Sequence, residues 1–343
     1  MNKPMCFNTG ETKVVVLGAN HHNTYGVIRA LGIKGIHPYV ILVSKDNNSF
    51  LLRSKYIYDS NILKSTEEVI KYLLDKSDEL KGSVVIACSD ALSSAIDCNC
   101  KQLSMYYKLP GSSNQGQITS YMDKDIMSIL AREVGLCTPK SWLVSSLSDI
   151  DQVEYPCITK PIMSKDGSKT DISICSDKKE LENVIKKGSC NRYQVQKFIE
   201  KDFEYQLIGC SMGGGNVIII PGFSRCIRPC PRTNTGFLHY ESIQSISAPI
   251  TNCEEFIRKT GYSGLFSIEF LRDKQGQDYF MEINFRNDGN AICVTASGFN
   301  LPYLWYLSNT EGAERVANEV CKLSLHPVDV MAEFADFDNV VRS

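Results

Sequence analysis

The chain has 343 residues, which is enough for two to three domains with buried cores and excludes a small scaffold held together by disulfides. Hydrophobic residues make up 43% and charged residues 22%, and 37 Lys and Arg against 39 Asp and Glu leave a formal net charge of −2. This balance gives no reason to expect nucleic acid or an anionic membrane as a partner. The apolar runs, such as those beginning at Val14 and Val217, are far shorter than the ~20 residues of a membrane helix, so we expect a soluble globular protein.

The fourteen cysteines are scattered, and the polar start MNKPMCFNTGETK lacks the apolar region of a signal peptide. We therefore expect a cytoplasmic protein with free, mostly buried thiols. Cys98 with Cys100, and Cys226 with Cys230, are close in sequence, but neither pair is followed by a second pair or by suitably spaced histidines. A structural zinc site is not expected.

Residues 13–110 alternate between short β-rich runs and amphipathic stretches, which predicts a parallel sheet covered by helices. The predicted strands begin at Val14, Tyr39 and Val84, and the predicted helices include residues 27–31, 66–80 and 91–106. Since ligands of such sheets bind at the carboxyl ends of the strands, the turns after the first and last of these strands are candidates for binding a small substrate. They offer Asn20, Ser89 and Asp90.

The alternative is that both turns are ordinary connections between strand and helix. The first one, Gly18–Gly26, has the wrong glycine spacing for a dinucleotide fingerprint, so a nicotinamide-dependent dehydrogenase is only a remote hypothesis.

The pattern changes after Gly111. A helix is predicted with Asp123 as its N-cap and Gly135 as its stop, and with an apolar face of Ile126, Ile129, Leu130 and Val134. Strand-like runs then predominate and predict an α+β assembly of largely antiparallel strands. They begin at Cys157, Asp171, Tyr193, Glu204, Asn216, Gly264 and Asp278, with helical patterns at residues 178–187 and 254–260 between them. Residues after about 324 contain no interpretable motif.

The stretch that begins at Gly264 is the most informative. In its second strand, side chains alternate between two opposite faces, so that one face would carry the residues for chemistry and the other would belong to the core. The first face would carry Phe280, Glu282, Asn284 and Arg286, and the second Tyr279, Met281, Ile283 and Phe285.

A tight turn centred on Gln275–Gly276 would place Glu269 opposite Glu282, and Ser267 opposite Asn284. Two opposed carboxylates repel each other unless one is protonated or a cation lies between them. Two carboxylates and an amide oxygen suit Mg²⁺, with Mn²⁺ as the alternative ion, so Glu269, Glu282 and Asn284 are the predicted metal ligands. A longer turn would destroy this pairing, and an exposed hairpin with unrelated charges is the other reading.

Six short motifs follow one another along the chain: MDKDIMSILAREVGLCTP, CITKP, MSKDGSK, VQKFI followed by Glu204, GLFSIEF, and EINFR. In this order they resemble the motifs of ATP-grasp enzymes, and within that superfamily those of the carboxylate–amine ligases, including relatives of D-aspartate ligase. The resemblance implies an α/β and α+β protein: an N-terminal α/β domain over residues 1–112 and an ATP-grasp domain over residues 113–343. The latter would hold Mg·ATP between two subdomains, of which the smaller is a lid at about residues 138–200.

The resemblance also implies roles for individual residues, all of them around the nucleotide and its metal. Lys124 and Lys160 would contact the phosphates, Lys160 would also reach the adenine edge, and a loop would cover the phosphates with Ser164, Lys165, Gly167 and Ser168. The adenine pocket would be lined by Gln196, Lys197 and Ile199, and the ribose would be bound by Glu204. Arg286 would act in catalysis with Lys160, and a substrate carboxylate would be recognised by Arg225, Arg228 and Arg232. A solvated Lys124 and ordinary surface arginines are the plain alternatives. Relatives often have Glu where Gln196 stands, which leaves the contact to the adenine amino group open.

The function implied by this resemblance is an ATP-dependent carboxylate–amine ligase. A substrate carboxylate would be phosphorylated by ATP, and an amine would then displace phosphate from the acyl phosphate, giving an amide, ADP and phosphate. The substrates would be small molecules such as amino acids or peptide-like acids, and the protein could form a homodimer as relatives do. The alternatives are a kinase or other phosphoryl transferase, and a catalytically idle ATP-binding protein, using the same site.

Overall fold

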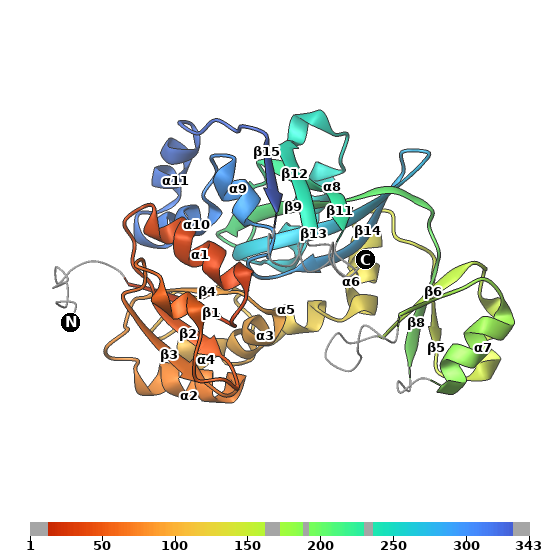
Figure 1. The fold of residues 1–343 in the computed structure, drawn as a ribbon, viewed down its shortest axis with the longest axis horizontal. Helices are drawn as coiled ribbons and strands as arrows, with labels where there is room; N and C mark the ends of the chain where they lie inside the picture. The colour runs from red at the N-terminus through yellow and green to blue at the C-terminus, as the bar shows by residue number, and fades with distance from the viewer. Residues whose placement is uncertain (1–12, 162–171, 188–191, 230–235, 332–343) are drawn as a thin grey trace.

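The computed structural model describes residues 13–161, 172–187, 192–229 and 236–331. Figure 1 shows three sheets, one built from the N-terminal segment, one large and central, and one in a lid on one side of the body. Within these described ranges, no helix is long and apolar enough to cross a membrane.

The N-terminal sheet is parallel, with the strand order β3-β2-β1-β4. Its strands are β1 (Val14–Gly18), β2 (Tyr39–Val43), β3 (Asp59–Leu63) and β4 (Val84–Ala87). The apolar runs of β1, β2 and β4 are buried on both faces, as expected for parallel strands between helices. The edge strand β3 was not expected, because its sequence DSNIL is polar and it is only partly buried.

Serine caps position two helices of this domain. Ser65 accepts a hydrogen bond from the Glu68 N–H at the start of α2, and Ser89 does the same for Leu92 in α3. The helices are α1 (His22–Gly32), η1 (Phe50–Arg53), α2 (Thr66–Asp75), α3 (Asp90–Cys98) and α4 (Cys100–Leu103).

The central sheet is antiparallel, with the order β14-β13-β9-β11-β12-β15 and with β10 paired to β9. Its strands are β9 (Lys201–Met212), β10 (Val217–Ile219), β11 (Gly222–Pro229), β12 (Gly236–Ser242), β13 (Gly264–Asp273), β14 (Asp278–Asn284) and β15 (Val328–Met331). The run that begins at Asn216 forms two strands, because Pro221 interrupts it and lacks the N–H that a continuous ladder needs. The short strand β15, in the segment without a motif, pairs with β12.

One face of the central sheet is covered by α6 (Lys124–Glu133) and α8 (Ile250–Thr260). Asp123 is the N-cap of α6, as predicted, and accepts hydrogen bonds from the N–H groups of Asp125 and Ile126. The predicted apolar face of α6 was wrong in part, because Ile126 is 42% exposed and Ile129 is 50% exposed. The helix carries a second apolar stripe at helical spacing, and this one packs on the sheet: Met127, Leu130, Ala131 and Val134.

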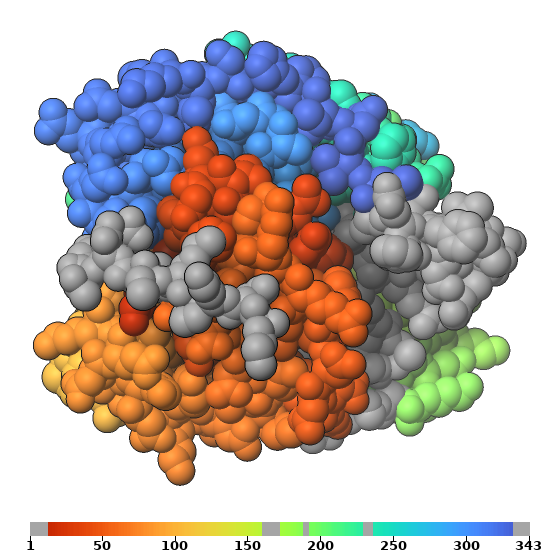
Figure 2. All heavy atoms as spheres, turned by 60° about the vertical axis from the view of Figure 1, so that its left-hand side comes forward, coloured from red at the N-terminus to blue at the C-terminus, as the bar shows by residue number. Residues whose placement is uncertain are grey.

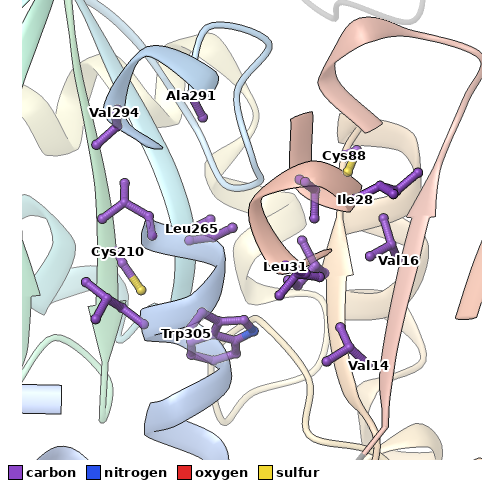
Figure 3. Packing of buried hydrophobic residues seen from close by; sticks show 14 of the residues in the cluster. Val14, Val16, Ile28, Leu31, Cys88, Cys210, Leu265, Ala291, Val294 and Trp305 are labelled. Carbon is purple, nitrogen blue, oxygen red and sulfur yellow. The ribbon is translucent and has the colours of Figure 1, made fainter. Parts of the chain in front are cut away.

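The opposite face of the central sheet packs on C-terminal helices and on the N-terminal domain. The C-terminal helices are α9 (Ile292–Ala296), α10 (Leu301–Thr310) and α11 (Ala313–Val320). Figure 3 shows Leu31 of α1 and Trp305 of α10 in one core with Leu265 of β13. In Figure 2 the N-terminal domain lies directly against the blue C-terminal helices. Segments at opposite ends of the chain thus form one core.

The lid is an antiparallel sheet with the order β5-β8-β6-β7. Its strands are β5 (Ser141–Val144), β6 (Cys157–Pro161), β7 (Ser173–Cys175) and β8 (Tyr193–Lys197), and one face is covered by η2 (Leu147–Gln152) and α7 (Lys178–Lys187). The remaining helices are α5 (Gln117–Tyr121) and η4 (Ile243–Ser245). The limits 1–112, 113–343 and 138–200 stay predictions.

Candidate active site

The site is built on the β13–β14 hairpin, in which Glu269 lies directly opposite Glu282 and Ser267 opposite Asn284, as predicted. The predicted tight turn was wrong. Arg272 pairs with Asp278, and the turn is closed by a hydrogen bond of 3.0 Å from the Asp273 N–H to the Gln277 carbonyl. Met281 forms a one-residue bulge between the pair Phe270–Phe280 and the pair Glu269–Glu282. Beyond this bulge the two strands have the expected register.

The bulge also changes which side chains share a face. Phe280 was expected beside Glu282, but it is 1% exposed and lies in the core with Ile283 and Phe285. Because a bulge inserts one extra residue, Phe280 and Glu282 point to opposite faces although they are two residues apart. The carboxylate face of β14 therefore carries Glu282 and Asn284 without Phe280.

A row of polar side chains runs across the sheet from this pair. Glu269 lies opposite Gln206 of β9, and Gln206 opposite Ser224 of β11. The Gln206 Nε2 donates to Glu269 Oε1 at 3.0 Å, and the Asn290 Nδ2 donates to Gln206 Oε1 at 2.7 Å. Gln206 and Asn290 were not predicted, because only the strand pairing and the fold of the loop after β14 bring them to Glu269.

The pKa of Glu269 is raised to about 8, first by burial and then by the negative charges of Glu282 and Asp288. An ionised pair at this position is unfavourable until a cation joins it. Glu269, Glu282 and Asn284 therefore fit a hard cation with oxygen ligands. In the part of the chain that the structure describes, no group of three His, Cys, Asp or Glu is placed to hold a metal, so any ion here would need further ligands from water or a bound molecule.

Arg286 connects this pair to the N-terminal domain. Its guanidinium donates to Asp288 at 3.0 Å, to Asn284 Oδ1 at 3.1 Å and to Asp90 at 3.1 Å. Burial disfavours the charge of Arg286, but the carboxylates of Asp90 and Asp288 outweigh it and raise its pKa further. Of the three predicted substrate residues in the turns of the N-terminal sheet, Asp90 is thus brought to the site.

The other two have structural partners. Ser89 is the N-cap of α3, and Asn20 is exposed and accepts a hydrogen bond of 2.8 Å from Ser49 Oγ. Their binding roles stay predictions.

Two histidines that the sequence did not single out, His21 and His22, follow the carboxyl end of β1. Their ring centroids are 3.9 Å apart, and His21 is close enough to Arg286 to feel its charge. His21 Nδ1 accepts from the Asn23 N–H at 3.2 Å and caps α1. His22 Nε2 is buried and has no hydrogen-bond partner in the described part of the chain. A Cβ at position 289 would lie 3.0 Å from this atom, so the glycine leaves room for the imidazole. Burial, with His21 next, lowers the pKa of His22 to about 4, so its imidazole is neutral at pH 7.

Predicted nucleotide residues lie where the lid meets the body. Lys124 is half-buried in the first turn of α6, and the backbone of Lys160 pairs with Gln194 in the lid sheet. Gln196 is 5% exposed on β8, and Ile199, half-buried, follows the strand. The Lys197 amine is 3.3 Å from Glu154, and the Lys197 N–H donates to the Lys140 carbonyl.

Glu204 lies on the same face of the central sheet as Gln206, in contact with Lys201 at 2.8 Å. It lines a small, partly open cavity, whose other residues are Tyr205, Gln206, Ser224, Cys226 and Leu238. Since Gln206 contacts Glu269, this cavity adjoins the carboxylate pair.

Arg225 of β11 is not brought to this site. The Arg225 guanidinium lies over the Phe203 ring at 4.2 Å, on the face opposite Ser224, and the exposed Arg228 lies over Phe237 at 5.7 Å. The role of Arg228 stays a prediction. Ser164, Lys165, Gly167, Ser168 and Arg232 lie outside the described residues.

No family model matches the chain. The formate-dependent phosphoribosylglycinamide formyltransferase of Bacteroides fragilis is 26% identical over 197 residues, which are 52% of this chain and 48% of that protein. The protein of the same name from Nitratiruptor sp. is 23% identical over 93% of this chain and 84% of that protein. A putative D-alanine–D-lactate ligase of Streptomyces coelicolor is 30% identical over 29% of each chain. The chain spans about half the length of the first of these curated relatives.

Solved structures are similar over most of the chain. The biotin carboxylase domain of the Hydrogenobacter thermophilus 2-oxoglutarate carboxylase has a TM-score of 0.69, with 17% identity, 88% of this chain covered and 70% of that one. For the L-amino acid ligase from Bacillus licheniformis the TM-score is 0.68, with 17% identity, 89% of this chain covered and 77% of that one. These similarities confirm the fold that was expected from the order of the sequence motifs.

Proposed function

We propose that this chain is an ATP-grasp enzyme, an ATP-dependent ligase that joins a carboxylate to an amine. The observation that carries the proposal is the opposed pair of Glu269 and Glu282, linked through Asn284 and Arg286 to Asp90 at the edge of the N-terminal sheet. In this proposal, a metal–nucleotide site would adjoin a site for a second small molecule.

The proposed reaction has two steps. An oxygen of the substrate carboxylate attacks the γ-phosphorus of ATP, and the bond to the bridging oxygen breaks to release ADP. The amine nitrogen then attacks the acyl carbon, loses a proton, and displaces phosphate to leave an amide. Phosphorylation is needed because an unactivated carboxylate has no good leaving group.

The residues of this chain mainly position the reactants and neutralise charge. Glu269, Glu282 and Asn284 would hold Mg²⁺, or Mn²⁺ in its place, which when bound neutralises phosphate charge. Arg286 and Lys160 would offset charge during phosphoryl transfer, and Lys124 would contact a phosphate at the start of α6.

The remaining predicted residues would enclose the nucleotide. Gln196, Lys197 and Ile199 would contact adenine, and Glu204, which lines the cavity on β9, would bind the ribose. Ser164, Lys165, Gly167 and Ser168 would cover the phosphates, and Arg228 or Arg232 would bind an acid substrate. Water exclusion would protect the acyl phosphate.

The names of similar proteins support a small acid and a small amine as substrates. They include an L-amino acid ligase and a putative D-alanine–D-lactate ligase, so amino acids and peptide-like acids are the first candidates. The biotin carboxylase domain among the similar structures is described as a dimer, which supports a homodimer here.

The test is a screen of acids and amines for ADP release with Mg·ATP, followed by mass measurement of the product. We expect ADP release that requires both an acid and an amine, and a product mass equal to their sum less water. ADP release without an amine, with a phosphorylated product, would contradict ligation and establish the phosphoryl transferase. No ATP consumption with any pair would establish the idle nucleotide-binding protein.

The variant Glu282→Gln should lower turnover on the order of 100-fold or more, because it removes a charged metal ligand. It should also weaken binding of Mn²⁺, measured by the loss of the free-ion electron paramagnetic resonance signal. Glu314→Gln, on the exposed face of α11, is the matched control and should change neither property. Full activity of Glu282→Gln would refute the metal assignment.

A further inference from the structure

The lid strand β8 buries two amide side chains where it faces the start of α6. Gln194 is 1% exposed and Gln196 is 5% exposed, and both alternate with Tyr193 and Val195, which pack in the lid core under α7. Amides with so little access to water need partners inside the protein. The two glutamines therefore belong to the face of the lid that is turned away from its own core.

Their hydrogen bonds form a chain with one direction. The Gln194 Nε2 donates to Asp125 Oδ1 at 2.9 Å, and the Gln196 Nε2 donates to Gln194 Oε1 at 3.1 Å. An ionised carboxylate only accepts hydrogen bonds, so Asp125 fixes the amide of Gln194, and Gln194 in turn fixes that of Gln196. The relay leaves Gln196 Oε1 at its end.

Among the residues that the structure describes, Gln196 Oε1 is buried and has no hydrogen-bond partner. A buried acceptor without a donor is unfavourable, so this atom is suited to a donor on a bound molecule. The relay prevents the amide from rotating to present its NH₂ group instead. The site therefore selects a donor and disfavours an acceptor at this point.

Apolar surface lies next to the acceptor. Across the lid sheet, Gln196 lies opposite Ile158, and Ile158 opposite Ile174, which is 57% exposed. Directly opposed residues share a face, so this row offers exposed hydrocarbon beside a single acceptor. Such a surface fits the flat face of a heterocycle that carries an amino group at its edge.

We propose that Asp125 and Gln194 are positioning residues that hold Gln196 Oε1 as the acceptor for the exocyclic amino group of adenine. The protein would thereby select adenine nucleotides over those with an oxygen at the 6-position of the purine. This inference rests on the proposed function, because it requires a nucleotide between the lid and the body. It gives Gln196 a fixed orientation.

The test compares the dissociation constants of ADP and IDP, with Mg²⁺, by titration calorimetry. IDP replaces the 6-amino group by an oxygen, so it would present an acceptor to Gln196 Oε1. The wild-type protein should prefer ADP. In Asp125→Asn the new amide can donate to Gln194 Oε1, which allows the relay to run in reverse, and the ADP-to-IDP preference should fall on the order of tenfold.

A second substitution distinguishes orientation from simple damage. Gln196→Glu provides an acceptor in either orientation, so Asp125→Asn combined with Gln196→Glu should regain the preference for ADP. Asp151→Asn, which removes a surface ion pair with Lys178 in the lid, is the matched control and should leave the preference unchanged. If Asp125→Asn does not fold, Gln194→Met makes the same test by removing the acceptor that fixes Gln196.

The outcomes separate this inference from the proposed function. Tight binding of ADP and IDP with equal constants by the wild-type protein, or an unchanged preference in Asp125→Asn, would overturn the relay and leave the ligase proposal standing. Failure of the wild-type protein to bind either nucleotide would overturn both.

Discussion

At the scale of single residues, Glu269 and His22 have pKa values shifted away from their usual ranges in opposite directions. Burial is the first cause in both cases, because it disfavours the charged form of either group. Glu269 therefore stays protonated at pH values where it would be ionised in the unfolded chain. His22 stays neutral at pH values where it would be protonated in the unfolded chain. We therefore expect the stability of the metal-free protein to fall both when the pH drops into the acid range and when it rises toward 8.

For Glu269 the folded-state pKa of about 8 lies above the ordinary value of 4.5. Its contribution to stability is complete below pH 4.5 and is lost as the pH rises toward 8. In chelator, the melting temperature should fall over this window. After allowance for partial solvent access, Glu269→Gln should recover roughly 1–2 kcal/mol at pH 8, a few degrees in a thermal melt. Equal slopes in variant and wild type would contradict this.

For His22 the folded-state pKa of about 4 lies below the ordinary value of 6.5. The unfolded chain binds this proton more readily, so stability falls as the pH drops from 6.5 toward 4. We expect His22→Gln to flatten the acid side of the melting profile between these values. His326→Gln, at an exposed position, serves as the control, and an identical acid limb in wild type and His22→Gln would show that His22 is not its cause.

At the scale of elements, the bulge in β14 explains how a wrong turn prediction still gave the correct opposition of Glu269 and Glu282. The longer turn shifts the register by one residue, and Met281 shifts it back. Local sequence predicted the turn region and the carboxylates, but not the bulge, since a bulge depends on how the neighbouring strand twists. The buried stripe of α6 was ambiguous for a similar reason: its sequence offers two apolar stripes, and only the sheet selects one.

Deleting Met281 tests this account. Phe280 and Glu282 already point to opposite faces, so removal of the residue between them leaves a regular strand with the same opposition of Glu269 and Glu282. We expect the dissociation constant of Mn²⁺ to stay within about a factor of three of the wild-type value, because the deletion rearranges the strand only locally. Loss of binding as complete as in Glu282→Gln would show that the bulge itself shapes the metal site.

At the scale of the whole molecule, the site depends on the docking of the N-terminal domain against the loop after β14. Asn23, which is 5% exposed, donates to the Cys88 and Asn287 carbonyls at 2.9 and 2.8 Å, and Ser93 Oγ donates to the Phe285 carbonyl at 2.7 Å. These contacts join residues far apart in sequence. No local pattern could have predicted that His21 and Asp288 meet Arg286, whereas the motif order was sufficient to predict the fold.

Asn23→Ala should therefore destabilise the protein by about 2 kcal/mol, because it leaves two buried carbonyls without their donor. Chemical denaturation should report this loss. Asn114→Ala, at an exposed position, should be nearly neutral. If the effects of Asn23→Ala and Asn287→Ala on the free energy of unfolding simply add in the double variant, the two side chains do not act as one docking contact.

The hydrogen bonds of Arg286 to Asp90 and to Asn284 bear on the order in which the two reactants bind. A single guanidinium spans the place where an acid would arrive and the place where a terminal phosphate would lie. Whichever reactant enters first alters the partner available to the other, so ordered addition, rather than random encounter, is the behaviour that initial-rate kinetics should reveal.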